Sequence, residues 1–186
     1  MTALAPHLTA FLREHLPHER QASPHTCAAY AYSFQLLLSF AAARLRTTPS
    51  SIQIEQLDPP LILAFLEYIE DGRGNSARTR NARLAAIKAF FRFLEYRLPS
   101  CLDQARRTRA LPMKKVDETL VSHLTREEMQ ALLDAPDPCR VSGLRDRAML
   151  HLAFAAGLRV SELVSLRIDQ IDRQAAASIH VMGKGR

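Results

Sequence analysis

The chain has no tryptophan, little glycine and little cysteine. Its three cysteines, Cys27, Cys101 and Cys139, are widely spaced and include no C-x-x-C pair, which argues against a disulfide framework or a zinc site and favours reduced thiols. The seven histidines form no H-E-x-x-H or comparable ligand cluster, and neither a P-loop nor a G-x-G-x-x-G occurs. We therefore expect no metal site, no cofactor and no use of nucleotides.

Signals for export or membrane insertion are also missing. The N-terminus lacks a basic region followed by a sustained apolar stretch, and no segment is expected to approach the length of a bilayer-spanning helix. The 186 residues, 47% of them apolar, suit one or two globular domains. We therefore expect a cytoplasmic protein with no membrane partner.

Positive charge is in excess and is unevenly placed. Lys and Arg number 25 against 19 Asp and Glu, so the net charge is +6 and the pI is near 9.6. Residues 71–97 hold seven bases against two acids, and residues 101–117 hold five against two. The chain from Glu118 onward is balanced. The excess therefore predicts an anionic partner for the first half of the chain and the segment that follows it.

The first hundred residues have the pattern of four helices. Three helix-start signals precede stretches with apolar residues at helical spacing, namely Ser23-Pro24, Asp58-Pro59-Pro60 and Asn75-Ser76. A shorter amphipathic segment with Leu4, Leu8, Phe11 and Leu12 comes before all of them. The pattern predicts a compact four-helix domain over residues 1–100.

Pro99 ends this domain, and the basic stretch 101–122 is predicted to be a linker. A second domain, residues 123–186, begins with the capping box Thr125-Arg126-Glu127-Glu128, in which hydroxyl and carboxylate satisfy each other's free amides. The fold class is therefore mainly α.

Within the second domain, a helix is expected over 144–156, ended by Gly157 in a left-handed conformation, and a short one over 160–166. Alternating apolar residues predict a strand over 177–182, and the glycine-rich turn 183–185 makes it the start of a short β-hairpin.

The most informative motif is Gly157-Leu158-Arg159 with Glu162 shortly after it. A guanidinium is always charged and its planar fork fits two phosphate oxygens. Arg159 lies beside a helix start, where free amides favour an anion, and Glu162 is close enough to hold the guanidinium in place. Lys184, between two glycines, offers a mobile proton donor. The alternatives are a structural Arg–Glu pair and a solvated surface lysine.

A second group of candidates lies on the basic helix after Ser76 and in the linker. Lys88 and Arg92 fall on the polar side of that helix. Arg80 and Arg83 fall near its apolar arc and are expected to project past the core, which suits a helix end inserted into a groove. A solvated basic face is the alternative, but the basic linker favours nucleic acid. The candidate DNA-contacting residues are Arg78, Thr79, Arg80, Arg83, Lys88, Arg106, Arg107 and Arg109.

Together these segments resemble the tyrosine recombinase, or phage integrase, family and its Xer-type members. The runs SPHTCAAYAYSFQLLLSFAAARL and SARTRNARLAAIKAFFRFLEYRLP resemble two characteristic helices of the core-binding, SAM-like domain. LTREEMQALLDA, GLRDRAMLHLAFAAGLRVSELVSLRIDQID and IHVMGKGR resemble the opening of the catalytic domain. The resemblance covers essentially the whole chain in the right order, and GLRVSEL is its most specific element.

The resemblance implies roles for three residues. Arg159 corresponds to the first catalytic arginine, which binds the scissile phosphate, and Glu162 to the acidic residue that supports it. Lys184 matches the lysine that protonates the leaving 5′-hydroxyl. In such enzymes a tyrosine attacks the phosphate of double-stranded DNA to give a 3′-phosphotyrosyl link without a cofactor. Other recombinase protomers, in a tetrameric synapse, are the implied protein partners.

Part of the family's pattern has no match in this sequence. The H-x-x-R segment, a further histidine or tryptophan and the nucleophilic tyrosine belong after residue 186. The four tyrosines, Tyr30, Tyr32, Tyr68 and Tyr96, all precede Arg159. We therefore expect an N-terminal fragment or natural truncation that binds DNA but does not cut it alone.

Two other classes of function stay open on the sequence. One is a non-catalytic DNA-binding or regulatory protein that uses the same residues to occupy sites. The other is a helical module whose basic face binds an acidic protein, although such a module has no need of the set formed by Arg159, Glu162 and Lys184.

Overall fold

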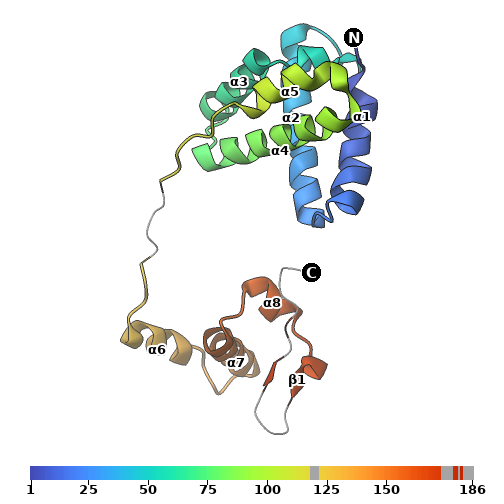
Figure 1. Ribbon diagram of the computed structural model, residues 1–186. Helices are drawn as coiled ribbons and strands as arrows, with labels where there is room; N and C mark the ends of the chain where they lie inside the picture. The colour runs from blue at the N-terminus through green and yellow to red at the C-terminus, as the bar shows by residue number, and fades with distance from the viewer. Residues whose placement is uncertain (118–121, 173–177, 180, 182–186) are drawn as a thin grey trace. The chain divides into compact units, whose positions relative to one another are not determined.

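The computed structural model describes residues 1–117, 122–172, 178, 179 and 181. It divides into two compact units, Met1–Glu118 and Thr119–Arg186 (Figure 1). Helices dominate both units, which confirms the expected mainly α class.

The first unit is built from five α-helices with short π- and 3₁₀-helices between them. Its α-helices are α1 (Leu4–Ala10), α2 (Pro24–Leu45), α3 (Pro59–Glu67), α4 (Ala77–Arg97) and α5 (Leu102–Arg109). The π-helices η1 (Phe11–Glu19) and η4 (Tyr68–Gly72) continue α1 and α3. The 3₁₀-helices are η2 (Pro49–Ser51), η3 (Ile54–Gln56) and η5 (Pro99–Cys101).

The three predicted helix starts are confirmed by their capping hydrogen bonds. The Ser23 hydroxyl accepts the Thr26 amide at 3.2 Å at the start of α2. An Asp58 carboxylate oxygen accepts the Leu61 amide at 2.9 Å at the start of α3. Ser76 caps α4 in the same way. Each cap satisfies an amide that has no partner within the helix.

Phenylalanine rings from three helices meet in the core of this unit. Phe11 of η1 lies 5.4 Å from Phe90 of α4, ring centre to ring centre, and Phe34 of α2 lies 5.3 Å from the same ring. The planes meet at 66° and 73°, the edge-to-face arrangement that aromatic rings prefer. All three side chains are almost completely buried. The core therefore fixes α4 against α2 and η1.

The expectation that no segment approaches the length of a bilayer-spanning helix is wrong. Helix α2 has 22 residues and contains an 18-residue stretch with a mean hydropathy of 1.2, so these two measures alone would let it cross a bilayer. In the structure, however, Phe34, Leu37 and Ala41 of α2 lie at 0–1% exposure in the core. These three residues thus belong to the core of the first unit, and core helices can meet the same test as membrane spans.

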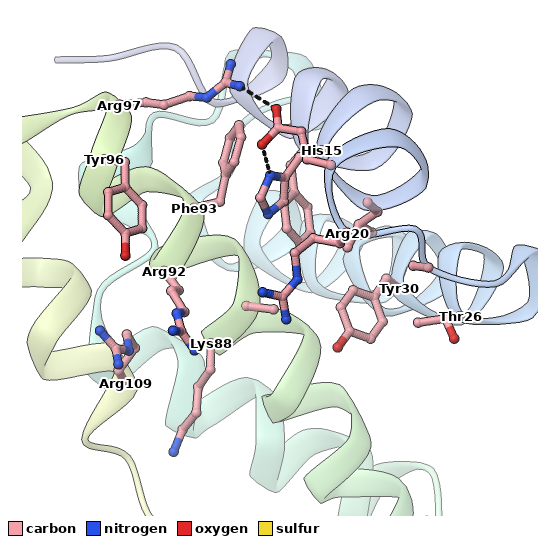
Figure 2. A pocket seen from close by; sticks show the side chains of 15 residues that line it. His15, Arg20, Thr26, Tyr30, Lys88, Arg92, Phe93, Tyr96, Arg97 and Arg109 are labelled. Atoms are coloured by element: carbon pink, nitrogen blue, oxygen red, sulfur yellow. Dashed lines mark hydrogen bonds and ion pairs between the residues drawn. The ribbon is translucent and has the colours of Figure 1, made fainter. Parts of the chain in front are cut away.

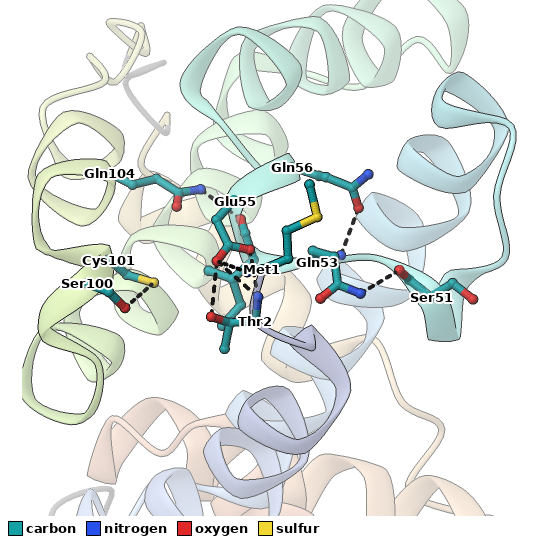
Figure 3. Close-up of polar contacts among 10 residues, drawn as sticks. Met1, Thr2, Ser51, Gln53, Glu55, Gln56, Ser100, Cys101 and Gln104 are labelled. Atoms are coloured by element: carbon teal, nitrogen blue, oxygen red, sulfur yellow. Dashed lines mark hydrogen bonds and ion pairs between the residues drawn. The ribbon is translucent and has the colours of Figure 1, made fainter.

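The predicted linker 101–122 begins with folded structure instead. Helix α5 lies alongside α4 (Figure 1), and Cys101, Ala105 and Thr108 are buried against the rest of the unit. The Gln104 amide also donates to two backbone carbonyls around η3, at 2.8 and 3.0 Å (Figure 3). The small buried residues of α5 allow close packing although its composition is basic. The first unit therefore extends beyond residue 100.

The second unit contains three α-helices and a short antiparallel strand pair among its described residues. Its elements are α6 (Arg126–Asp134), α7 (Val141–Ala156), α8 (Val160–Ser165), the 3₁₀-helix η6 (Ile168–Gln170), β1 (Ile171–Asp172) and β2 (Ser178–Ile179). The capping box before α6 is confirmed, because the Thr125 amide donates to Glu128 at 2.8 Å and the Glu128 amide donates to the Thr125 hydroxyl at 3.2 Å.

The strand at residues 178–179 differs from the expectation in its partner. Sequence reasoning placed the partner after the turn at 183–185, but β2 pairs with the preceding β1, with Ile171 opposite Ile179. A partner on the N-terminal side was missed because β1 has only two residues and follows a helical pattern.

Two glycines shape the second unit for different reasons. Gly157 ends α7 with φ at +61°, as predicted, a conformation that only glycine adopts without strain. Gly143, inside α7, is needed for space, since a Cβ there would lie 1.9 Å from the Asp137 carbonyl oxygen.

Candidate functional site

Arg159 and Glu162 form the pair that the motif predicts. Arg159 is the N-cap of α8, and its backbone amide donates to one Glu162 carboxylate oxygen at 2.9 Å. Its guanidinium donates to the other oxygen, also at 2.9 Å. The Glu162 side chain is 13% exposed, whereas that of Arg159 is 69% exposed. The largely buried Glu162 carboxylate therefore fixes the Arg159 side chain, and most of the guanidinium surface stays accessible to a ligand.

These hydrogen bonds change the acidity of Glu162. The Arg159 backbone amide, followed by the Arg159 guanidinium, holds the pKa of the Glu162 carboxyl below its ordinary value. Glu162 is therefore a carboxylate at neutral pH and keeps the arginine oriented.

The backbone places Arg159 at a junction between two helices. Gly157 turns the chain at the end of α7, and the Leu158 amide still donates back to the Ala153 carbonyl at 3.2 Å. Arg159 then takes an extended conformation with ψ at 154° before α8 begins. Lys184, the third residue of the predicted set, lies outside the described residues.

Arg80, expected to project past the core, is instead buried at 5% exposure. Its guanidinium donates to the Pro112 carbonyl oxygen at 3.3 Å and to the Asn81 side chain at 3.2 Å. Its Nε lies 3.5 Å from a Glu70 carboxylate oxygen. An arginine near an apolar arc therefore serves here to join α4, η4 and the segment after α5.

Arg83 likewise points into the unit. Its guanidinium donates to the Ser33 hydroxyl at 3.0 Å and lies 4.9 Å from the centre of the Tyr32 ring. Both partners belong to α2. Arg83 thus connects the two long helices, and only part of its surface stays exposed.

The other candidate DNA-contacting residues on α4 and α5 differ in whether their side chains have a partner within the protein. Arg109 is held by Glu95, both of whose carboxylate oxygens lie 2.7 Å from its guanidinium, and this pairing raises its pKa. Arg107 lies 3.8 Å from Asp103 and is 65% exposed. Arg78 and Arg106 are exposed and have no partner in the part of the chain that the structure describes. The Thr79 amide donates to the Ser76 hydroxyl that caps α4, and the Thr79 hydroxyl lies 3.3 Å from the same oxygen.

Two family models match the chain in sequence order. Residues 8–97 match the model described as phage integrase, N-terminal SAM-like domain, and residues 122–186 match the phage integrase family model. The chain belongs to the phage integrase family. The first match runs from the middle of α1 to the end of α4, and the second includes the Arg159–Glu162 pair.

Named members of this family are similar over the whole chain. The integrase/recombinase y4rC of Sinorhizobium fredii is 46% identical over 99% of the chain and 55% of its own length. The tyrosine recombinase XerC of Myxococcus xanthus is 35% identical over 100% of the chain and 58% of its own length. The chain therefore spans somewhat more than half the length of these relatives.

Sequence reasoning missed a polar clamp in this integrase unit. The Asn81 side chain donates to the Lys114 carbonyl at 2.7 Å and accepts the Lys114 amide at 3.0 Å. The Lys114 ammonium also lies 2.8 Å from Glu70. These residues are 33 and 44 positions apart, so no local pattern could reveal them.

No cluster of three or more His, Cys, Asp or Glu that could hold a metal ion occurs within the described ranges. The three cysteines are all free thiols, and Cys101 is buried.

Proposed function

We propose that this chain binds double-stranded DNA and contributes the first half of a tyrosine recombinase site. In this role Arg159 binds the scissile phosphate, Glu162 orients Arg159, and Lys184 protonates the leaving 5′-hydroxyl. The observation that carries the proposal is the Arg159–Glu162 pair, in which an exposed guanidinium is fixed by a largely buried carboxylate. A preorganised cation of this kind stabilises the charge that develops on a phosphate during strand cleavage.

The full reaction would be site-specific recombination through a 3′-phosphotyrosyl intermediate, with further recombinase protomers assembled on DNA in the cytoplasm. No metal or cofactor takes part in this proposal, because the guanidinium and ammonium groups supply the positive charge. The membership of the chain in the phage integrase family supports this proposal.

The first unit would supply most of the affinity for DNA through backbone phosphates. Arg78 and Arg106 are the sharpest probes among the expected contacts, because both are exposed and neither is engaged within the described chain. Each replacement by alanine should reduce the slope of log affinity against log salt by about one. Arg13→Ala, an exposed arginine of η1, is the control with equal charge loss.

Binding of a duplex should therefore be measured at several salt concentrations for the wild type and the three variants. Salt-independent affinity, or none at all, would refute the proposal.

Arg159 is tested separately by sulfate, which mimics a phosphate. In the wild-type chain, sulfate should shift the amide resonances of residues 158–162, and Arg159→Ala should abolish these shifts. Arg159→Lys should restore them only in part, because an ammonium cannot make a bidentate contact. Equal responses in the wild type and Arg159→Ala would count against an anion site there.

A binding-only protein is the alternative function. It would show the same DNA affinity and the same anion site, but a chain extended by the second half of a recombinase would form no covalent link to DNA.

A further inference from the structure

A cavity of about 650 Å³ lies in the first unit, away from Arg159 in the sequence. It is bounded by η1, the start of α2, α4 and the end of α5. Figure 2 shows basic side chains from these elements around it. Leu16, Ala89 and Phe93 contribute apolar surface to its wall.

The charges around this cavity are strongly unbalanced. Arg20, Lys88 and Arg92 line it, and their charged side chains have no hydrogen-bond or ion-pair partner among the described residues. Arg20 follows η1, whereas Lys88 and Arg92 lie one helical turn apart on α4. Three cations from two separate segments thus face one space without a counterion.

The remaining charged residues of the cavity are already paired. Glu19, the acid in its wall, accepts a hydrogen bond from Arg97 at 3.0 Å and lies 2.6 Å from His15. Arg109 is bound by Glu95. Glu19 is therefore not available to neutralise the free cations, because its carboxylate already pairs with Arg97.

The pKa of Lys88 reflects first its burial and then the arginines near it. Burial, followed by repulsion from Arg109 and Arg80, holds the pKa of the Lys88 ammonium below its ordinary value. An anion placed in the cavity would act in the opposite direction and favour the charged lysine.

We propose that this cavity is a phosphate site that seats one phosphodiester of the DNA backbone between Arg20, Lys88 and Arg92. This proposal deepens the function proposed above and rests on it. Arginine forks bind phosphate oxygens in pairs, and lysine adds a point charge. The Thr26 and Tyr30 hydroxyls also line the cavity and offer neutral donors. Arg20 could not be grouped with the basic helix from the sequence because it lies 68 residues before Lys88.

A backbone phosphate shares its chemistry with free phosphate and nucleotides, so the experiment has to separate these sources. Duplex affinity should first be measured against salt concentration for Arg20→Ala and Arg92→Ala in the full 186-residue chain. Each variant should lower the slope of log affinity against log salt by about one. Arg13→Ala should not, although Arg13 lies on η1, the π-helix that ends just before Arg20. Arg92→Lys should keep the slope, because the charge is retained.

The second measurement is an NMR titration of the Lys88 side chain. Its pKa should rise when a short duplex is added, and Arg92→Ala should reduce the rise. If inorganic phosphate or a mononucleotide raises the pKa and the duplex does not, the cavity holds a free anion and the proposal is overturned. If no ligand raises it, there is no anion site.

The outcomes also separate this proposal from the broader one. If Arg78→Ala and Arg106→Ala lower the slope while the two cavity variants behave like Arg13→Ala, only the cavity proposal fails. If the wild-type chain does not bind the duplex, both proposals fail.

Discussion

The Arg83 guanidinium of α4 donates a 3.0 Å hydrogen bond to the Ser33 hydroxyl of α2, which is 1% exposed. The same hydroxyl donates at 2.7 Å to the Ala29 carbonyl one turn earlier. Arg83 therefore bridges two helices through a group that water does not reach, and a residue expected to contact DNA has a structural partner.

Arg83→Ala should lower the free energy of unfolding by about 1.5–3 kcal/mol, the range for losing a hydrogen bond to a charged group. Urea unfolding of the whole chain, followed by the signal of the first unit, measures it. Arg78→Ala is the control, since Arg78 lies on the same helix, is exposed and should change stability by less than about 0.5 kcal/mol. Equal effects of the two variants would contradict a bridging role.

Arg80 should act on stability and not on DNA affinity. Its side chain is buried beside Glu70, and removing one partner of a buried ion pair typically costs about 3 kcal/mol or more. Lys114 still pairs with Glu70 in Arg80→Ala and should moderate the loss. The salt dependence of DNA binding should stay as in the wild type wherever the variant is folded. A slope lowered by about one would show instead that Arg80 reaches a phosphate.

The sequence predicts helices here far better than it predicts what their arginines do. Helix starts depend on neighbours within four residues, so Ser23, Asp58 and Thr125 are identified correctly as caps. Arg159 and Glu162 are three residues apart, and their pairing is equally local.

Arg80 and Arg83 were misplaced because their partners are distant in the chain. Pro112 lies 32 residues from Arg80, and Ser33 lies 50 residues from Arg83. A helical wheel shows that an arginine lies near the apolar arc, but it cannot show whether another segment places a buried hydrogen-bond acceptor beside it. Helix α5 was missed for a related reason, because its buried face is made of small residues.

The Arg159–Glu162 pair should persist well into the acidic range. The pKa of Glu162 is lowered by folding, so its contribution to stability is fully present above the unfolded value of about 4.3 and is lost as pH falls through the lower folded value. A carboxyl-carbon NMR titration should give a midpoint below that of an ordinary glutamate.

Arg159→Ala should raise this midpoint only in part, because the backbone amide of residue 159 is the larger cause of the shift and survives the substitution. A midpoint at the ordinary value in the wild type, or full recovery in Arg159→Ala, would contradict the described geometry.

The 186-residue chain should not form a covalent link to DNA through its own tyrosines. All four lie in the first unit. Tyr30 stacks on Phe11, Tyr68 stacks on Phe40, and the Arg83 guanidinium lies over the Tyr32 ring, so each of these three makes a contact within that unit, although Tyr32 and Tyr68 are each 44% exposed. Tyr96 is 81% exposed and is therefore the tyrosine most accessible to DNA.

A nicked suicide substrate that carries the target site tests this directly. No denaturant-resistant adduct should form with the chain, whereas a version extended through a downstream tyrosine should form one and lose it with Arg159→Ala. An adduct of the 186-residue chain that disappears with Tyr96→Phe would overturn the prediction.

The polar clamp on Lys114 limits the length of the segment that connects the two units. Asn81 and Glu70 hold the chain as far as residue 114, and the capping box of α6 begins at Thr125. About ten residues then connect the units and reach at most ~35 Å, against ~75 Å for a free tether over the whole predicted linker. A shorter connecting segment raises the effective concentration of the second unit near any duplex to which the first unit binds. Breaking the clamp with Asn81→Ala should lower this effective concentration without changing a residue of either proposed DNA site.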